Sequence, residues 1–225
     1  PLLTSGNTGL ELWHNGKGHT HCVCGTGENT ADSTHAHEKL NWIGVTELKD
    51  LPEGNYYLLR GYSEAWAPTK DINLCLNGLG SSGAGDNAII DVDDSNKVAV
   101  TDCNESKPGT IIGSGWYARG VYVTSGSTFT LWNGKLTGLY DMSGSSSYNI
   151  QNGGGVWMKG GKFVMNGGSI SARSTNGHGG VVYMYSGTFI MNAGSISGKA
   201  LKGSGGAVYV EHGIFTMNGG TITGK

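Results

Sequence analysis

Cysteine and histidine residues near the N-terminus have the types and spacing of a zinc site. The segment 19–24 reads HTHCVC, and HAH follows after a loop. In extended chain Cys22 and Cys24 point to one side, as do His35 and His37. A hairpin between the two pairs would bring four ligands together in a tetrahedral Cys2His2 set. We therefore predict a zinc ion bound by Cys22, Cys24, His35 and His37.

His19 and His21 are alternative donors for the same metal. Four protein ligands leave no open coordination position, so this zinc would be structural rather than catalytic. The competing interpretation is an exposed, histidine-rich terminus that binds nothing.

Four aspartates form the single acidic cluster of the chain: Asp86, Asp91, Asp93 and Asp94. Such a cluster can bind calcium or supply the carboxylate pair of a polysaccharide-degrading enzyme. The alternative is a solvated corner loop. His178 and His212 are expected to be isolated and solvated, and no G-x-S-x-G, Walker or HExxH motif occurs. We therefore predict no catalytic residues and no enzymatic activity.

Aromatic residues recur at one position of a repeated segment: Tyr122, Trp157, Tyr183 and Tyr209. Flat aromatic faces in a row suit the apolar faces of sugar rings or the centre of a protein interface. We predict that these four side chains bind the ligand. The alternative is a structural ladder, in which the rings stabilise their own sheet through contacts with one another.

The elements that position these residues come from a repeat of 26 residues. Phe163, Phe189 and Phe215 are separated by this interval, and Asn166 and Asn192 keep the same step. Each unit contains three short stretches in which apolar and polar residues alternate, separated by Gly-rich turns. A fixed period of this kind is typical of stacked repeat architectures.

The repeat predicts an all-β fold, a right-handed, single-stranded parallel β-helix with about 26 residues per coil. Stacked coils about 4.8 Å apart would bury Val, Met, Phe and Ile in columns. The asparagines of the repeat should form a ladder at one corner of the triangular cross-section. The domains predicted are a Cys/His-rich capping segment at 1–50 and a β-helix at 51–225.

Residues 72–78 (INLCLNG) indicate that the β-helix has already begun there. Alignment of its Asn-Gly pair with the repeat places Leu74 at the position of Phe163, one coil of 24 residues before Val98. We expect five or six coils. Cys75 and Cys103 lie in adjacent coils and are a possible disulfide.

The composition and net charge of the chain narrow the classes of function that the protein can have. The 225 residues include 41 glycines, and the net charge of −2 gives no electrostatic basis for binding nucleic acid or inserting into a membrane. No apolar run reaches the length of a membrane span. Without an initiator Met, and with the repeat running to Lys225, the chain is expected to be part of a longer secreted protein, and a monomer.

Several motifs together resemble a known group of proteins. The segments HTHCVCG, LCLNG, TDC and GGAVYV…FTMNGGTITG are similar to the large, wall-anchored, repeat-rich surface proteins of Gram-positive gut bacteria. The resemblance implies pectate-lyase-like β-helix repeats that often serve adhesion. We therefore expect a non-catalytic binding module at the bacterial cell surface, with a host glycan or glycoprotein as partner. A β-helix lyase or glycoside hydrolase and a purely structural stalk are the alternatives.

Overall fold

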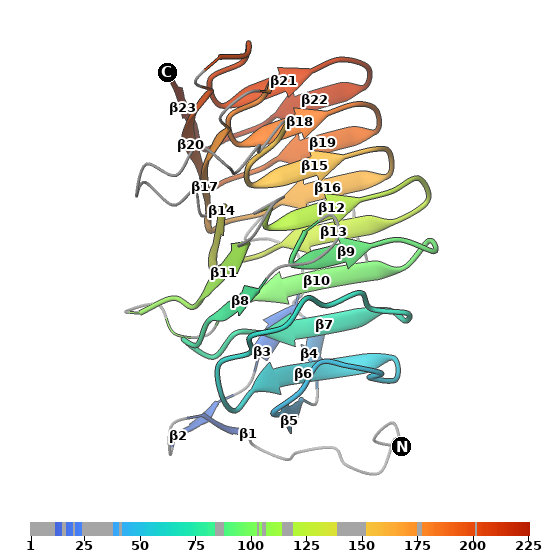
Figure 1. Ribbon diagram of the computed structural model, residues 1–225. Coiled ribbons are helices and arrows are strands. Elements are labelled where there is room, and N and C mark those ends of the chain that lie inside the picture. The colour runs from blue at the N-terminus through green and yellow to red at the C-terminus, as the bar shows by residue number, and fades with distance from the viewer. Residues whose placement is uncertain are drawn as a thin grey trace.

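The chain folds into a solenoid of β-strands (Figure 1). The structure, a computed structural model, describes residues 12–14, 17–19, 21–23, 38–40, 42–83, 88–102, 104, 107–113, 119–138, 152–174, 177–200 and 202–225. These residues contain no helix, and so none that could span a membrane. Three parallel sheets run along the solenoid, which confirms the predicted parallel β-helix.

The largest sheet has eight strands, each paired in parallel with its neighbours. Their order from the N-terminal end is β5 (Ile43–Val45), β6 (Gly54–Leu58), β7 (Ile72–Cys75), β10 (Lys97–Thr101), β13 (Thr128–Leu131), β16 (Lys162–Met165), β19 (Thr188–Met191) and β22 (Ile214–Met217).

The second sheet has six strands and the third has five. The six-stranded sheet comprises β8 (Ser81–Gly83), β11 (Thr110–Gly113), β14 (Lys135–Gly138), β17 (Ser169–Ser174), β20 (Ser195–Ala200) and β23 (Thr221–Gly224). The five-stranded sheet comprises β9 (Ile90–Val92), β12 (Val121–Val123), β15 (Val156–Met158), β18 (Val182–Met184) and β21 (Val208–Val210).

Successive strands alternate among the three sheets, so β7 to β21 make five complete coils and β22 and β23 begin another. This agrees with the expected five or six. The chain before β7 forms an irregular first coil, in which Tyr62 and Trp66 make single bridges to Ser81 and Ile90. The edge strand β5 belongs to the parallel sheet although it precedes residue 51.

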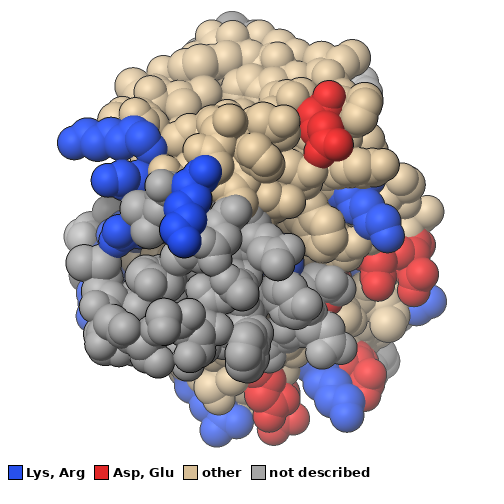
Figure 2. All heavy atoms as spheres, turned by 45° about the horizontal axis from the view of Figure 1, so that its top comes forward, with Lys and Arg blue, Asp and Glu red and all other residues tan. Residues whose placement is uncertain are grey.

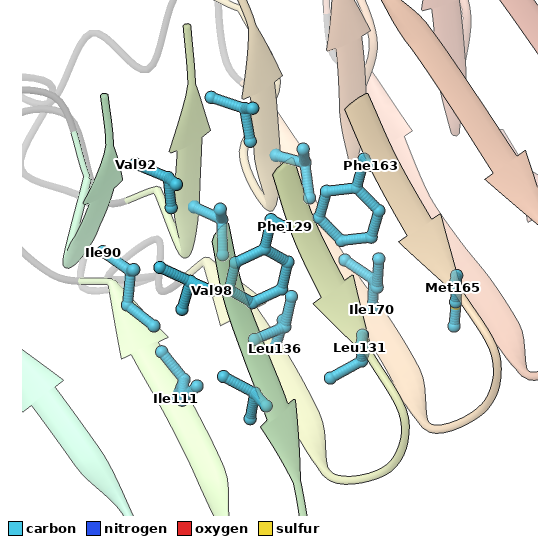
Figure 3. Close-up of a cluster of buried hydrophobic side chains, with 14 of the residues drawn as sticks. Ile90, Val92, Val98, Ile111, Phe129, Leu131, Leu136, Phe163, Met165 and Ile170 are labelled. Atoms are coloured by element: carbon cyan, nitrogen blue, oxygen red, sulfur yellow. The ribbon is translucent and has the colours of Figure 1, made fainter. Parts of the chain in front are cut away.

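The core consists of columns of similar side chains between the sheets (Figure 3). Phe129, Phe163, Phe189 and Phe215 are paired in register, and the Phe163 and Phe189 rings stack with centroids 4.6 Å apart. Apolar residues fall inward because successive side chains of a strand point to opposite faces. The predicted stacking of like residues is therefore confirmed.

The asparagine ladder is also confirmed. The Asn192 amide donates from Nδ2 to Oδ1 of Asn166 at 2.7 Å, and Asn218 donates to Asn192 at the same distance. Each asparagine amide donates a hydrogen bond to the amide one coil before it. The corners after β16, β19 and β22 are therefore hydrogen-bonded to one another along the solenoid axis.

The predicted alignment of residues 72–78 is wrong by two positions. Val98 pairs with both Ile72 and Phe129, so Ile72, and not Leu74, occupies the position of Phe163. The corner after β7 contains two additional residues. Within it, Asn77 and Gly78 adopt left-handed backbone angles (φ 55° and 69°). The full coil from Ile72 to Val98 is therefore 26 residues, as in the later repeats.

The carboxylate of Asp102 stabilises this longer corner. It accepts backbone N–H groups from Gly78 (3.1 Å), Asn104 (2.7 Å) and Gly109 (2.7 Å), and the Asp102 residue is buried. The LCLNG and TDC motifs are thus two halves of one hydrogen-bonded corner. Cys75 is fully buried among Trp42 and Tyr57. Because Cys103 lies outside the described residues, the possible disulfide between Cys75 and Cys103 is not tested.

Candidate functional site

Four aromatic residues occupy one position in adjacent strands of the five-stranded sheet. Tyr122 pairs with Trp157, Trp157 with Tyr183, and Tyr183 with Tyr209. We call this set the aromatic column. Its register is as predicted, and Asp91 of β9 precedes Tyr122 at the N-terminal end of the column. All five lie on the outer face, because the flanking residues Val156 and Met158 point into the core.

The rings of the aromatic column are only partly open to solvent. Tyr122 and Tyr183 are 7% and 6% exposed, while Trp157 and Tyr209 are partly exposed. The Tyr122 and Trp157 centroids are 4.7 Å apart, and those of Tyr183 and Tyr209 are 5.7 Å apart and nearly parallel. The column therefore stabilises its own sheet and presents ring edges outward.

Arg119 covers part of the column near its N-terminal end. Its guanidinium carbon lies 4.6 Å from the centre of the Trp157 ring, in a cation–π geometry. Arg119 is buried, and its Nε donates to the Asn152 carbonyl oxygen at 2.9 Å. The Trp157 indole Nε1 is buried without a hydrogen-bond partner in the part of the chain that the structure describes.

A second row of side chains lies beside the column and is exposed. Lys159, Tyr185 and Glu211 follow β15, β18 and β21 two residues after the column. We call them the outer row. Tyr185 is 48% exposed, and its ring contacts that of His212 at 5.9 Å in an edge geometry. The outer row thus adds one open aromatic ring, one cation and one carboxylate to the face.

The column and the outer row are connected by a hydrogen bond. The Tyr183 hydroxyl donates to Oε2 of Glu211. Burial raises the pKa of Tyr183, and the hydrogen bond to the Glu211 carboxylate raises it further. Burial and the charge of Asp91 raise the pKa of Tyr122, against the opposing effect of Arg119. Both hydroxyls therefore remain protonated donors at neutral pH.

His178 belongs to the site, contrary to the expectation that it stands alone. Its ring stacks on Tyr209 with centroids 4.5 Å apart, and its Nδ1 accepts the backbone N–H of Ser204 at 3.0 Å. The backbone N–H of His178 in turn donates to Oδ1 of Asn152. Asn152, His178 and Ser204 are spaced by 26 residues, so the repeat period could have placed His178 beside the column. His212, likewise expected to be isolated, contacts Tyr185.

Three aspartates of the acidic cluster have described positions at β9 and just after it, and both Asp91 and Asp93 act on the charge environment of Tyr122. Asp91 lies on β9 at the end of the aromatic column, whereas Asp93 and Asp94 follow that strand; Asp86 is outside the described residues. Burial, and then the charge of Asp94, raise the pKa of Asp93. Among the residues with described positions, no three His, Cys, Asp or Glu side chains are grouped as metal ligands.

The predicted zinc ligands are not tested, because Cys24, His35 and His37 lie outside the described residues. The backbone around them is partly described. β1 (Leu12–His14) pairs with β2 (Lys17–His19), and β3 (His21–Val23) pairs with β4 (Glu38–Leu40), both antiparallel. Because β3 ends before residue 24 and β4 begins after residue 37, their antiparallel pairing brings the two ends of the 24–37 segment together. The zinc prediction requires the ends of this segment to be close in this way.

Figure 2 views the solenoid obliquely, with its C-terminal end tilted forward, and among the described residues basic and acidic side chains are both present and scattered. The outer row contributes a cation and an anion to the same face, so the site has no strong charge of one sign. Such a surface favours an uncharged or weakly charged ligand over a polyanion.

No protein-family model, curated protein or solved structure matches this chain.

Proposed function

We propose that this protein is a non-catalytic, adhesin-type binding module, secreted and held at a bacterial cell surface, that binds glycan chains of a host. The glycan contacts the outer face of the five-stranded sheet. The observation that carries the proposal is the combination, on one rigid face, of the aromatic column and the exposed outer row.

This combination matches the chemistry of sugars. A pyranose ring has an apolar face that stacks on an aromatic ring, and hydroxyl groups that need hydrogen-bond partners. Tyr185 supplies an exposed ring and Trp157 and Tyr209 supply partly exposed rings, while Lys159 and Glu211 supply a donor and an acceptor. Neighbouring strands are about 4.8 Å apart, so successive coils can contact successive sugar residues of an extended chain.

A glycan array tests the proposal with a matched pair of variants. The Tyr185→Ala variant should bind about tenfold more weakly than wild type, because it removes the most exposed ring of the face. Tyr185→Phe keeps the ring and should retain most of the affinity. Ser197→Ala, on the outer face of the six-stranded sheet, is the control for a general surface effect. Equal binding by all four proteins would contradict this site.

A polysaccharide-degrading enzyme is the second candidate. It is favoured by the place of Asp91, directly beside Tyr122 and at the end of the aromatic column. Asp93, with its raised pKa, would be the general acid. Release of oligosaccharides from a bound glycan, abolished in Asp93→Asn, would replace the binding proposal by this one. If neither binding nor release occurs, the structural stalk is the remaining function.

We also propose that the N-terminal segment binds one structural zinc ion through Cys22, Cys24, His35 and His37. Elemental analysis should find about one zinc per chain, as a closed tetrahedral site requires. The double variant Cys22→Ser/Cys24→Ser should contain none, and its β-helix should stay folded, since each coil contacts only its neighbours. A folded wild-type protein without zinc would overturn the proposal.

A further inference from the structure

The corner between β13 and β14 has an unusual arrangement of an Asn-Gly pair. The backbone N–H of Gly134 donates to Oδ1 of the preceding residue, Asn133, at 2.8 Å. The other end of the same amide, Nδ2, donates to the Asp102 carbonyl oxygen at 3.3 Å. The Asn133 amide accepts one hydrogen bond through Oδ1 and donates the other through Nδ2, so both hydrogen bonds support the same orientation of the amide group. Together they hold the side chain against its own backbone.

Gly134 cannot readily be another residue at this corner. Its φ is +100°, and an added Cβ would lie 3.0 Å from Leu76 Cδ1. The fold therefore requires a glycine directly after Asn133.

This geometry brings together the two groups that react in asparagine deamidation. The Gly134 nitrogen lies 2.8 Å from Oδ1 of Asn133, so after loss of its proton to hydroxide only a rotation of the side chain is needed to bring Cγ to the nitrogen. Reacting groups that are already held close together need little further ordering. We propose that Asn133 is a preferred site of spontaneous deamidation, a covalent modification that does not depend on the proposed glycan binding.

The reaction consumes one water and releases one ammonia. The Gly134 nitrogen forms a bond to Cγ of Asn133, the Cγ–Nδ2 bond breaks, and Nδ2 leaves as ammonia with a proton from solvent. The product is a cyclic succinimide. Water then adds to one of its two carbonyl carbons and opens the ring to aspartate or isoaspartate. Asn133 is partly exposed, so water reaches it.

Other Asn-Gly pairs in the described coils have one of these two groups engaged elsewhere. The Gly78 N–H donates to the Asp102 carboxylate, and the Gly153 N–H donates to backbone carbonyls of residues 178 and 179. The amides of Asn166 and Asn218 belong to the asparagine ladder. At these positions the ladder or the corner must open before the nitrogen can attack, which slows the reaction.

Deamidation would weaken the middle of the solenoid. The new carboxylate replaces the Nδ2 donor that faces the Asp102 carbonyl, so a hydrogen bond becomes a repulsive contact. Isoaspartate additionally lengthens the backbone of the corner by one atom. Asn133→Asp is therefore expected to be less stable than wild type.

Peptide mapping by mass spectrometry after incubation of the native protein in heavy-oxygen water at mildly alkaline pH tests the proposal. Asn133 should convert at least about fivefold faster than Asn77, Asn152, Asn166 and Asn218, because its two reacting groups contact each other instead of being engaged elsewhere. The same sites in the urea-unfolded chain should convert at similar rates. Asn133→Gln, which cannot form the five-membered ring, should yield no product in that peptide.

Two outcomes would overturn the proposal. One is conversion of Asn133 in the native protein at or below the rate of Asn152 and Asn166. The other is an unchanged Asn133 over a period in which the unfolded chain converts completely.

Discussion

Replacing Phe163 with alanine should lower the free energy of unfolding by about 3–5 kcal/mol. Phe163 is fully buried, and its ring lies between those of Phe129 (5.1 Å) and Phe189 (4.6 Å). Removing the ring leaves a cavity in the centre of the aromatic core, and hydrogen-bonded strands on either side cannot collapse to fill it.

Phe215→Ala is the matched control for this prediction. Phe215 occupies the same column in the last coil, stacks on Phe189 alone among described rings, and is partly exposed. The Phe215→Ala variant should lower the free energy of unfolding by less than about 2 kcal/mol, because removing this ring encloses little new cavity. Urea unfolding followed by circular dichroism compares the two variants, with hydrogen exchange of β13, β16 and β19 to detect local opening. Equal destabilisation by both would contradict the continuous core.

Replacing Asp102 with asparagine should destabilise the fold by about 3 kcal/mol, although the two side chains have nearly the same shape. The carboxylate accepts three backbone N–H groups, from Gly78, Asn104 and Gly109. An amide can accept through its oxygen only, and its NH2 group would face N–H donors. Buried donors would then lose their partners at the corner between β10 and β11.

Asp71→Asn separates this effect from a simple loss of charge. Asp71 accepts one backbone N–H, from Lys97 at 2.7 Å, in an exposed position. Water can replace that bond, so the change should be within about 0.5 kcal/mol. Thermal unfolding of both variants at neutral pH provides the comparison. If Asp102→Asn were as mild as Asp71→Asn, the assignment of Asp102 as the organiser of this corner would be wrong.

The sequence predicted the repeated part of the fold well because each coil obeys the same rules. Alternation places Phe163 and Met165 inward, and the 26-residue step places equivalent residues in register. The alignment failed at residues 72–78, where matching Asn-Gly pairs concealed two additional corner residues. The longer corner is stabilised by the contact between Asp102 and Gly78, and such a contact between coils leaves no periodic signal in the sequence.

The candidate site was predicted less completely. The register of the aromatic column followed from the repeat, but the burial of Tyr122 and Tyr183 did not. That burial depends on neighbouring side chains, such as Trp157 beside Tyr122 and Glu211 and Tyr209 beside Tyr183. The outer row lies two positions after the column in the sequence, but its exposure depends on packing that the repeat alone does not reveal.

The most direct test of the central claim is a nuclear magnetic resonance titration of the tryptophan indole N–H signals. The chain has six tryptophans, and Trp157→Phe identifies the signal of Trp157. We predict that a glycan retained by the wild-type protein on an array shifts the Trp157 signal, while the signals of Trp66 in the core and Trp132 on the eight-stranded sheet stay in place. Binding that shifts Trp132 and leaves Trp157 unchanged would place the ligand on another face and contradict the account.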